Sequence, residues 1–241
     1  MMCAAKLSRW VAWAADSRTI SIDFHLLIDG PTTVLELPSE LRLHAVPMAN
    51  ETAIRRRFGG MQWGSLQAAT ARTGPLQWSN HFPFYLDWYE QYGKHSGTKQ
   101  PYEYIWFIEH DAFFGGQLGA FLKPYKNIDA DLIDAFTPKN VSSWTEAFNW
   151  PMPLQLRRHK WEHVERISRR LLLTLRDITE LRMSAVGEVF ESSVCAALSW
   201  CTSRNLAGDG FVRQPYSSAY YNGNPMSKLC AQICIHITFM P

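Results

Sequence analysis

The feature that most constrains the fold is a short apolar run that stops at charged residues. The run from Tyr104 to Ile108 is aromatic or β-branched, and Glu109, His110 and Asp111 follow it directly, ahead of Gly115-Gly116. This composition predicts a strand buried on both faces, the usual environment of a central parallel strand. Residues two apart in an extended backbone project to the same side, so the carboxylates of Glu109 and Asp111 can face one point.

Two carboxylates at the carboxyl end of a strand predict a ligand site. Open α/β sheets bind ligands at that edge, and two oxygen anions there suit a hard divalent cation that contacts a diphosphate. A solvated strand end is the alternative interpretation. A hydrophobic strand that ends in an acid-x-acid triplet resembles the DxD-type motif of nucleotide-sugar glycosyltransferases with the GT-A fold. In that family the acidic pair holds Mn²⁺ or Mg²⁺ against the donor diphosphate, which implies Glu109 and Asp111 as the metal ligands, with Glu109 in place of the commoner Asp.

Length and charge set the broad class. A chain of 241 residues is long enough for a substantial core, and we expect a single α/β domain over residues 1–241. The resemblance implies a GT-A-like, Rossmann-like domain with a mostly parallel central sheet flanked by helices. Lys and Arg number 24 against 22 Asp and Glu, so no nucleic-acid partner is predicted. The five cysteines are an odd count that is too sparse for a disulfide scaffold, although Cys230 and Cys234 could form one bridge in a secretory compartment. No C-x-x-C pair or His-Cys cluster suggests structural zinc.

No run approaches the roughly 18 apolar residues of a membrane span. Glycosyltransferases of secretory pathways usually carry a signal anchor. We therefore expect either a cytosolic protein or a chain whose N-terminal anchor segment is missing, and in the second case the Golgi or another secretory compartment.

Periodicity predicts most of the remaining elements. Alternating or short apolar runs predict strands at 19–28, 41–46 and 131–136, and helical spacing predicts helices at 6–15, 79–92 and 161–181. The apolar tail at 229–239 fits either a strand or a helix.

Four further residues complete the predicted site. Asp29 follows the strand at 19–28 and is a candidate for contact with the nucleotide, as is Arg213 in a loop rich in Gly, Asn, Ser and Tyr. A helix followed by Gly-Glu and an apolar pair resembles the acceptor-side acid region of some GT-A enzymes, which implies Glu188 as the catalytic base, with Glu191 as its rival. They would share a face on a helix and oppose each other on a strand, and both alternatives remain open.

The leading hypothesis is a metal-dependent glycosyltransferase that moves a sugar from a nucleotide-sugar donor to a hydroxyl of a glycan or protein acceptor. An inverting reaction needs the base, and a retaining reaction does not. The first alternative is a catalytically inactive relative that binds sugar nucleotides or glycans. A weaker alternative is a metal-dependent phosphoesterase, which usually recruits more Asp and His ligands than this sequence offers.

Overall fold

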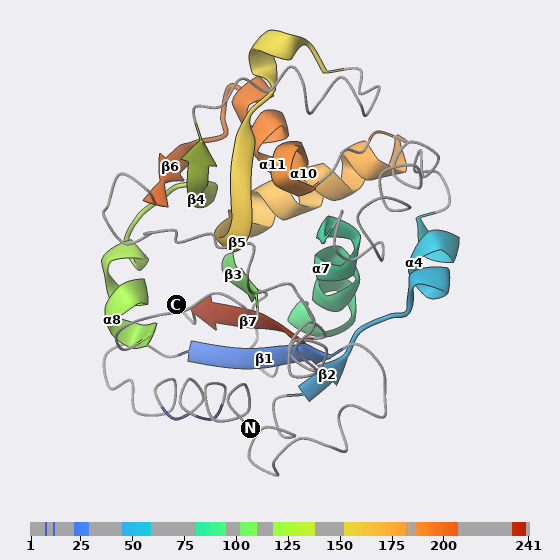
Figure 1. Cartoon of the computed structure of the whole chain (residues 1–241), viewed down its shortest axis with the longest axis vertical. Coiled ribbons are helices and arrows are strands. Elements are labelled where there is room, and N and C mark those ends of the chain that lie inside the picture. The colour runs from blue at the N-terminus through green and yellow to red at the C-terminus, as the bar shows by residue number, and fades with distance from the viewer. Residues whose placement is uncertain are drawn as a thin grey trace, which may run out of the picture.

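Figure 1 shows the structure, a computed structural model of the chain. The residues that it describes are 8, 12, 22–28, 45–58, 81–94, 102–109, 118–137, 152–181, 183, 187–206 and 233–239.

In the described part of the chain, seven strands form one sheet in the order β2-β1-β7-β3-β5-β4-β6. In chain order they are β1 (Ile22–Ile28), β2 (Ala45–Pro47), β3 (Tyr104–Glu109), β4 (Leu132–Thr137), β5 (His159–Ser168), β6 (Ser203–Asn205) and β7 (Ile233–Phe239). Helices and strands occur together, so the predicted α/β class is confirmed. The strands predicted at 19–28, 104–109 and 131–136 are confirmed in their main parts, the tail is a strand, and only the end of the run at 41–46 belongs to β2.

The prediction of a mostly parallel sheet is wrong, because the sheet is mixed. Four of its six strand pairings are antiparallel, and only β1 with β2 and β4 with β6 pair in parallel. These pairings give β1, β2, β3, β4 and β6 one common direction, while β5 and β7 run against them and lie on either side of β3. Hydrophobic periodicity reports which face of a strand is buried, but it carries no information about strand direction.

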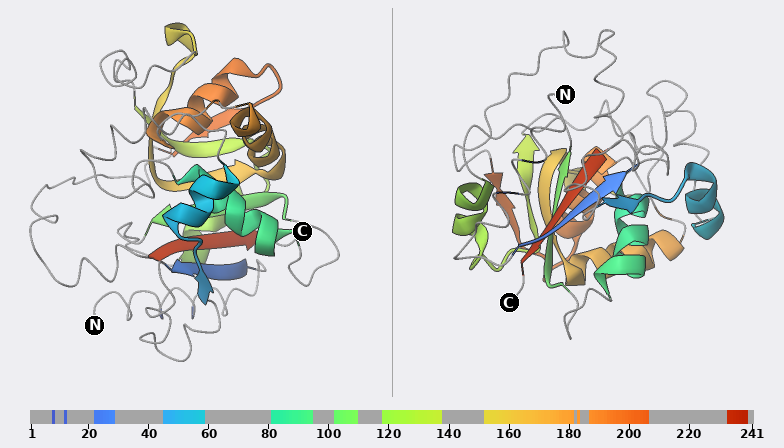
Figure 2. Two further views of the ribbon diagram at one scale, coloured as in Figure 1. Left: turned by 90° about the vertical axis from the view of Figure 1, so that its right-hand side faces the viewer. Right: turned by 90° about the horizontal axis from the view of Figure 1, so that it is seen from below.

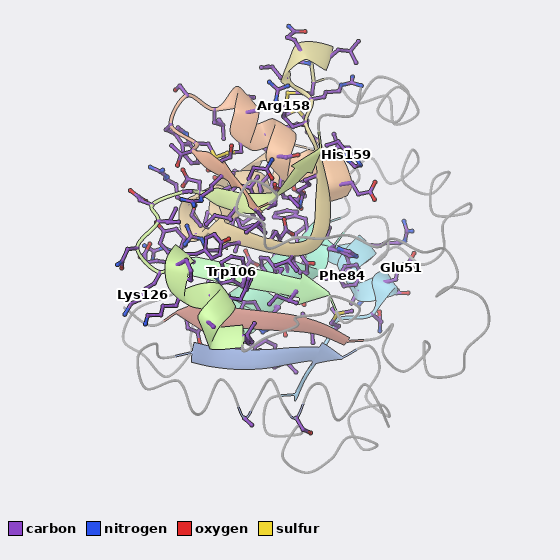
Figure 3. All side chains as sticks on the ribbon, turned by 60° about the vertical axis from the view of Figure 1, so that its left-hand side comes forward. Glu51, Phe84, Trp106, Lys126, Arg158 and His159 are labelled. Carbon is purple, nitrogen blue, oxygen red and sulfur yellow. A yellow bond between two sulfur atoms is a disulfide. The ribbon has the colours of Figure 1, made fainter. Side chains whose placement is uncertain are left out.

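The middle strand, β3, is buried on both faces as predicted. Ile105, Trp106, Phe107 and Ile108 are at most 1% exposed. Phe107 stacks on Tyr85 with ring centroids 3.8 Å apart, whereas the alternate residue Trp106 meets Phe121 edge-on at 5.6 Å. The strand therefore has one helix layer on each side, and Trp106 points toward the helix that follows it (Figure 3).

The helices form two layers of unequal size. One face of the sheet carries α7 (Phe82–Trp88), α10 (Arg169–Glu180) and α11 (Gly187–Ala197), with α4 (Glu51–Arg57) beside α7. The other face carries α8 (Leu118–Leu122) and the 3₁₀ turn η2 (Lys123–Tyr125). Figure 2 shows α8 across the strands from α7 and α10. The remaining turn is η4 (Leu154–Leu156), a 3₁₀ turn ahead of β5.

The aromatic helix predicted at 79–92 is confirmed over Phe82–Trp88, and it continues as one π-helical turn, η1 (Tyr89–Gly93). The helical spacing predicts a buried aromatic stripe of Tyr85, Trp88, Tyr89 and Tyr92; the first three are at most 2% exposed and belong to the core, whereas Tyr92 is 38% exposed. Phe82 also meets Phe190 of α11 at a centroid distance of 5.5 Å. This contact packs α7 against α11 over the sheet.

The helix predicted at 161–181 is wrong over its first half. Residues 159–168 form β5, and the helix begins only at Arg169. Ser168 caps it, since its hydroxyl accepts a hydrogen bond from the Leu171 backbone at 3.1 Å. Val164 and Ile167 fit helical spacing in the sequence, but β5 lies between β3 and β4 and its backbone groups pair with both.

Candidate functional site

The predicted ligand edge is set by strand direction. Because β1, β2, β3, β4 and β6 run the same way, their carboxyl ends share one edge of the sheet with the amino ends of β5 and β7. Glu109 ends β3 at this edge, and its backbone lies opposite Cys234 of β7. Asp111, Asp29 and Arg213 lie outside the described residues.

The two candidate bases are on a helix, which settles the choice of secondary structure at 187–191. Glu188 and Glu191 belong to the first turns of α11, and a separation of three residues places them on the same side of it. Their environments differ. The side chain of Glu191 is 1% exposed and forms an ion pair with Lys160 at 3.3 Å, whereas that of Glu188 is 24% exposed. Glu188 is therefore the one of the two that solvent or a substrate can reach.

A group of charged side chains that the sequence analysis missed is buried beneath α11. Lys160 of β5 pairs with Glu165 of the same strand as well as with Glu191, and all three side chains are at most 1% exposed. We call Asp134, Lys160, Glu165 and Glu191 the buried charge cluster. Glu165 falls inside the segment predicted as a helix at 161–181, and Lys160 directly precedes it, so both charges were expected on a solvated surface. Lys160 and Glu165 could have been predicted as buried only if this segment had been assigned to a strand that lies between two other strands.

The fourth member of the buried charge cluster is Asp134 of β4, whose carboxyl group lacks hydrogen bonds to the described residues. Asp134 is fully buried. Burial raises the pKa of Asp134 well above its ordinary value; Lys160 opposes that rise, while Glu165 and Glu191 add to it. The protein interior therefore favours the neutral acid, which avoids a third buried negative charge beside a single ammonium.

Glu188 lies beside a histidine at the predicted ligand edge. His159 begins β5 and pairs in register with Thr137, the last residue of β4. Its Nε2 is 3.7 Å from Oε2 of Glu188, and its side chain is 8% exposed. Figure 3 labels His159 at the start of β5.

Hydrogen bonds hold α11 to the start of β5. The Arg158 backbone N–H donates to the hydroxyl of Ser193 at 2.7 Å, and the hydroxyl of Ser192 donates to the Arg158 carbonyl at 2.7 Å. Ser192 and Ser193 are both buried, so these bonds also satisfy groups that water does not reach.

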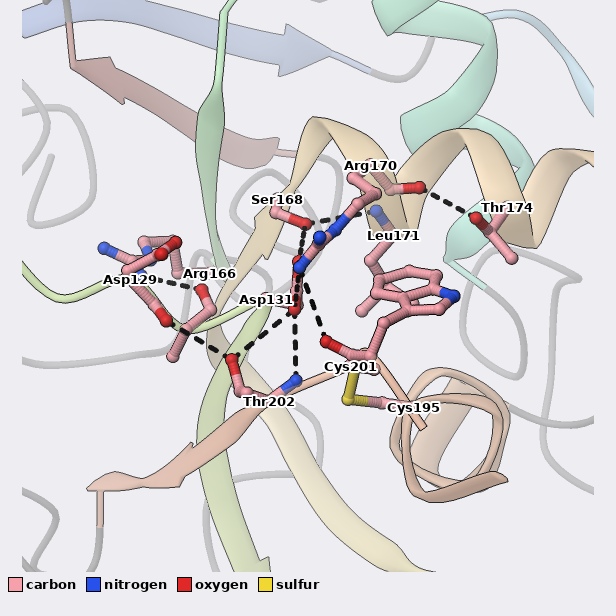
Figure 4. Close-up of a disulfide and its surroundings, with 12 residues drawn as sticks. Asp129, Asp131, Arg166, Ser168, Arg170, Leu171, Thr174, Cys195, Cys201 and Thr202 are labelled. Carbon is pink, nitrogen blue, oxygen red and sulfur yellow. Dashed lines mark hydrogen bonds and ion pairs between the residues drawn. A yellow bond between two sulfur atoms is a disulfide. The ribbon is translucent and has the colours of Figure 1, made fainter. Parts of the chain in front are cut away.

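The far end of α11 is tethered by a disulfide between Cys195 and Cys201. The next residue, Thr202, donates its backbone N–H to Asp131 at 3.0 Å (Figure 4). Asp131 also accepts from the hydroxyl of Ser168 at 2.8 Å and from Arg170 Nη2 at 2.8 Å. This carboxylate joins the start of β4, the junction of β5 with α10, and the segment that leads into β6.

The arginine cluster before Phe58 is the end of α4. Arg55 pairs with Glu51 one turn earlier at 2.6 Å, and Arg57 pairs with both Asp87 and Glu90. Carboxylates of the protein thus engage two of the three guanidinium groups.

Within the described ranges, no three His, Cys, Asp or Glu side chains gather as a metal-holding group. The side chain of Glu109 and all of Asp111 are outside those ranges, so the predicted metal site stays a prediction. No helix in the described part of the chain has the length and apolar character needed to cross a membrane.

Comparisons of the chain with models of known protein families, with curated proteins and with solved structures gave no match.

Proposed function

We propose that this protein is a metal-dependent glycosyltransferase that uses a nucleotide-sugar donor and a hydroxyl acceptor. The observation that carries the proposal is the shared edge of the sheet. Glu109 ends the buried middle strand there, and Glu188 stands beside His159, whose strand begins at the same edge. A strand end with a DxD-like triplet and a separate accessible carboxylate are the two parts that an inverting sugar transfer needs.

The donor set suits the proposed ion. Glu109 and Asp111 offer carboxylate oxygens, which are the hard ligands that Mg²⁺ and Mn²⁺ prefer. These two residues would hold the ion, and a bound ion would supply positive charge against the diphosphate of the donor. Asp29 and Arg213 are the proposed contacts to the nucleotide.

Glu188 is the proposed catalytic base. It takes the proton of the acceptor hydroxyl as the acceptor oxygen forms a bond to the anomeric carbon of the sugar. The bond between that carbon and the diphosphate oxygen breaks in the same displacement, and its electron pair leaves with the nucleoside diphosphate. Glu191 is unsuited to this role because it is buried and its charge is matched by Lys160.

Thermal unfolding with ligands tests the donor site. The wild type and Asp111→Asn are measured with nucleoside diphosphates and their sugars, each with and without Mn²⁺. We expect a stabilisation that requires Mn²⁺ in the wild type and is lost in Asp111→Asn, because that change removes one ligand charge at almost constant volume. Asp177→Asn is the matched control, since Asp177 is an exposed carboxylate of α10 with Arg176 as its partner. An equal response of the wild type and both variants would overturn the proposal.

Glu109 in place of the commoner Asp favours one other function, a relative that binds sugar nucleotides or glycans without transfer. Its longer side chain moves the first carboxylate by one methylene. A turnover assay separates the two functions: Mn²⁺-dependent binding with no release of nucleoside diphosphate supports the inactive relative, and release that requires an acceptor supports the transferase.

A further inference from the structure

Among the described residues, the imidazole of His159 lies at ion-pair distance from a buried oxygen of Glu188. This oxygen, Oε2 of Glu188, is shielded from solvent and accepts no hydrogen bond from any described residue. Within the same residues, His159 is the one group that can carry positive charge at ion-pair distance from it, at 3.7 Å. This separation exceeds a hydrogen bond, and catalytic hydrogen bonds in unliganded proteins are often this long before substrate tightens them.

The scaffold fixes both side chains by their neighbours in the sequence. Arg158, directly before His159, is bonded through its backbone to Ser192 and Ser193 of α11. Lys160, directly after His159, pairs with Glu191, which lies one helical turn beyond Glu188. The position of His159 relative to Glu188 is therefore set by contacts on both sides and does not depend on the weak pair itself.

The other charges near the pair are occupied elsewhere. Lys160 faces Glu165 and Glu191, and the buried Asp134, on β4, lies near those same groups. Arg157 donates to the Met152 carbonyl and Arg158 to the Gln155 carbonyl, both at 2.8 Å. The imidazole of His159 is thus the group placed to act on Glu188.

We propose that His159 is a positioning residue for Glu188, and this inference rests on the proposed function. The imidazole Nε2–H donates to the Glu188 carboxylate and aims its other oxygen at the sheet edge, where the acceptor hydroxyl is held. His159 itself takes no proton from the acceptor in this role. It restricts the orientation of the base, which raises the fraction of molecules in which the base is in reach of its proton.

Nuclear magnetic resonance of ¹⁵N-labelled histidines tests the pair without any turnover. We compare the ring nitrogen resonances of the wild type with those of Glu188→Gln. The Nε2 resonance of His159 is expected to shift, because Glu188→Gln removes the carboxylate charge that lies 3.7 Å from it. The resonances of His81, another buried histidine, serve as the control and should not move. An unchanged His159 resonance would overturn the inference.

Steady-state kinetics then test the role. Glu188→Gln should lower kcat by about 100-fold or more, as expected for a lost general base. His159→Gln and His159→Ala should each lower kcat by about tenfold with the KM for the donor unchanged, in line with the loss of an orienting partner. Adding His159→Ala to Glu188→Gln should cost nothing more, because the histidine acts through the glutamate. His81→Gln is the matched control and should retain wild-type kcat.

The outcomes separate the two proposals. Normal kcat in both His159 variants, beside a strong loss in Glu188→Gln, overturns the positioning role and leaves the glycosyltransferase intact. A shifted His159 resonance in a protein that turns over no donor overturns the proposed function, and the positioning role falls with it, leaving a purely structural pair.

Discussion

Lys160→Met tests whether the buried charge cluster depends on its single ammonium. The side chain of Lys160 is fully buried, and it is the cation recorded at ion-pair distance from two carboxylates, Glu165 and Glu191, that are themselves at most 1% exposed. Methionine keeps most of the volume and removes the charge. Both glutamates then lose the ammonium that pairs with them.

The magnitude follows from the cost of uncompensated buried charge. Removing one partner of a buried ion pair costs about 3 to 5 kcal/mol. Glutamates can limit the cost by binding a proton, as the interior already favours for Asp134, so we expect a loss of about 3 kcal/mol, the lower end of that range. For a chain of this length each kcal/mol corresponds to about 2 to 4 °C, so the melting temperature should fall by about 10 °C.

Urea denaturation followed by tryptophan fluorescence is the assay, and Trp106 is a buried reporter in β3. Lys126→Met is the matched control, because Lys126 is an exposed lysine and its loss should leave the unfolding midpoint unchanged. Adding Glu191→Gln to Lys160→Met removes one of the two buried negative charges and should restore part of the lost free energy of unfolding. A Lys160→Met protein within 0.5 kcal/mol of the wild type, about the range of ordinary surface substitutions, would refute the reasoning.

Three further predictions concern stability. Burial raises the pKa of Asp131, but hydrogen bonds from Arg170, Thr202 and Ser168 outweigh burial and hold that pKa below 3.8. The ionised Asp131 therefore stabilises the fold above pH 3.8, and this stabilisation is lost as the pH falls through the folded-state pKa. Asp131→Asn should flatten this acid-induced loss of stability in pH-dependent urea melts. The pH dependence expected from Asp134 is the reverse, because its pKa is raised. Its contribution to stability is complete below pH 3.8 and is lost as the pH rises through the folded-state pKa. Urea melts of Asp134→Asn should lack that decline, and an unchanged profile would contradict the burial argument. Cys195→Ser opens a loop of six residues and should lower the free energy of unfolding by about 2 kcal/mol in urea melts against the wild type, and a bridged 195–201 peptide under non-reducing mass spectrometry is the direct check.

The middle of the sheet could be predicted from local composition. The aromatic and β-branched run at 104–108 has enough apolar surface to require burial on both sides in any fold, and β3 is buried on both sides. The aromatic spacing at Tyr85, Trp88 and Tyr89 likewise fixes one face of α7 as core. Burial of apolar surface is a property of the residues themselves, so it can be read before the fold is known.

The direction of the strands and the buried charges required the tertiary structure. A strand pattern is the same whichever way its neighbour runs, so the reversed β5 and β7 were not predictable from periodicity. Lys160 and Glu165 are five residues apart and look like ordinary surface charges. They are buried because β5 lies between β3 and β4 and is covered by α11. Glu191 comes from α11 and Asp134 from β4, both distant from β5 in the sequence.

The candidate site divides in the same way. Residue order alone establishes that an acid-x-acid triplet follows the buried strand and that Glu188 and Glu191 are separated by three residues. Only the fold shows that these two glutamates lie on a helix, that Lys160 forms an ion pair with Glu191, and that His159 lies beside Glu188. The physical reason is that residue type and spacing are local properties, whereas the partner of a charge is set by which distant segments pack together.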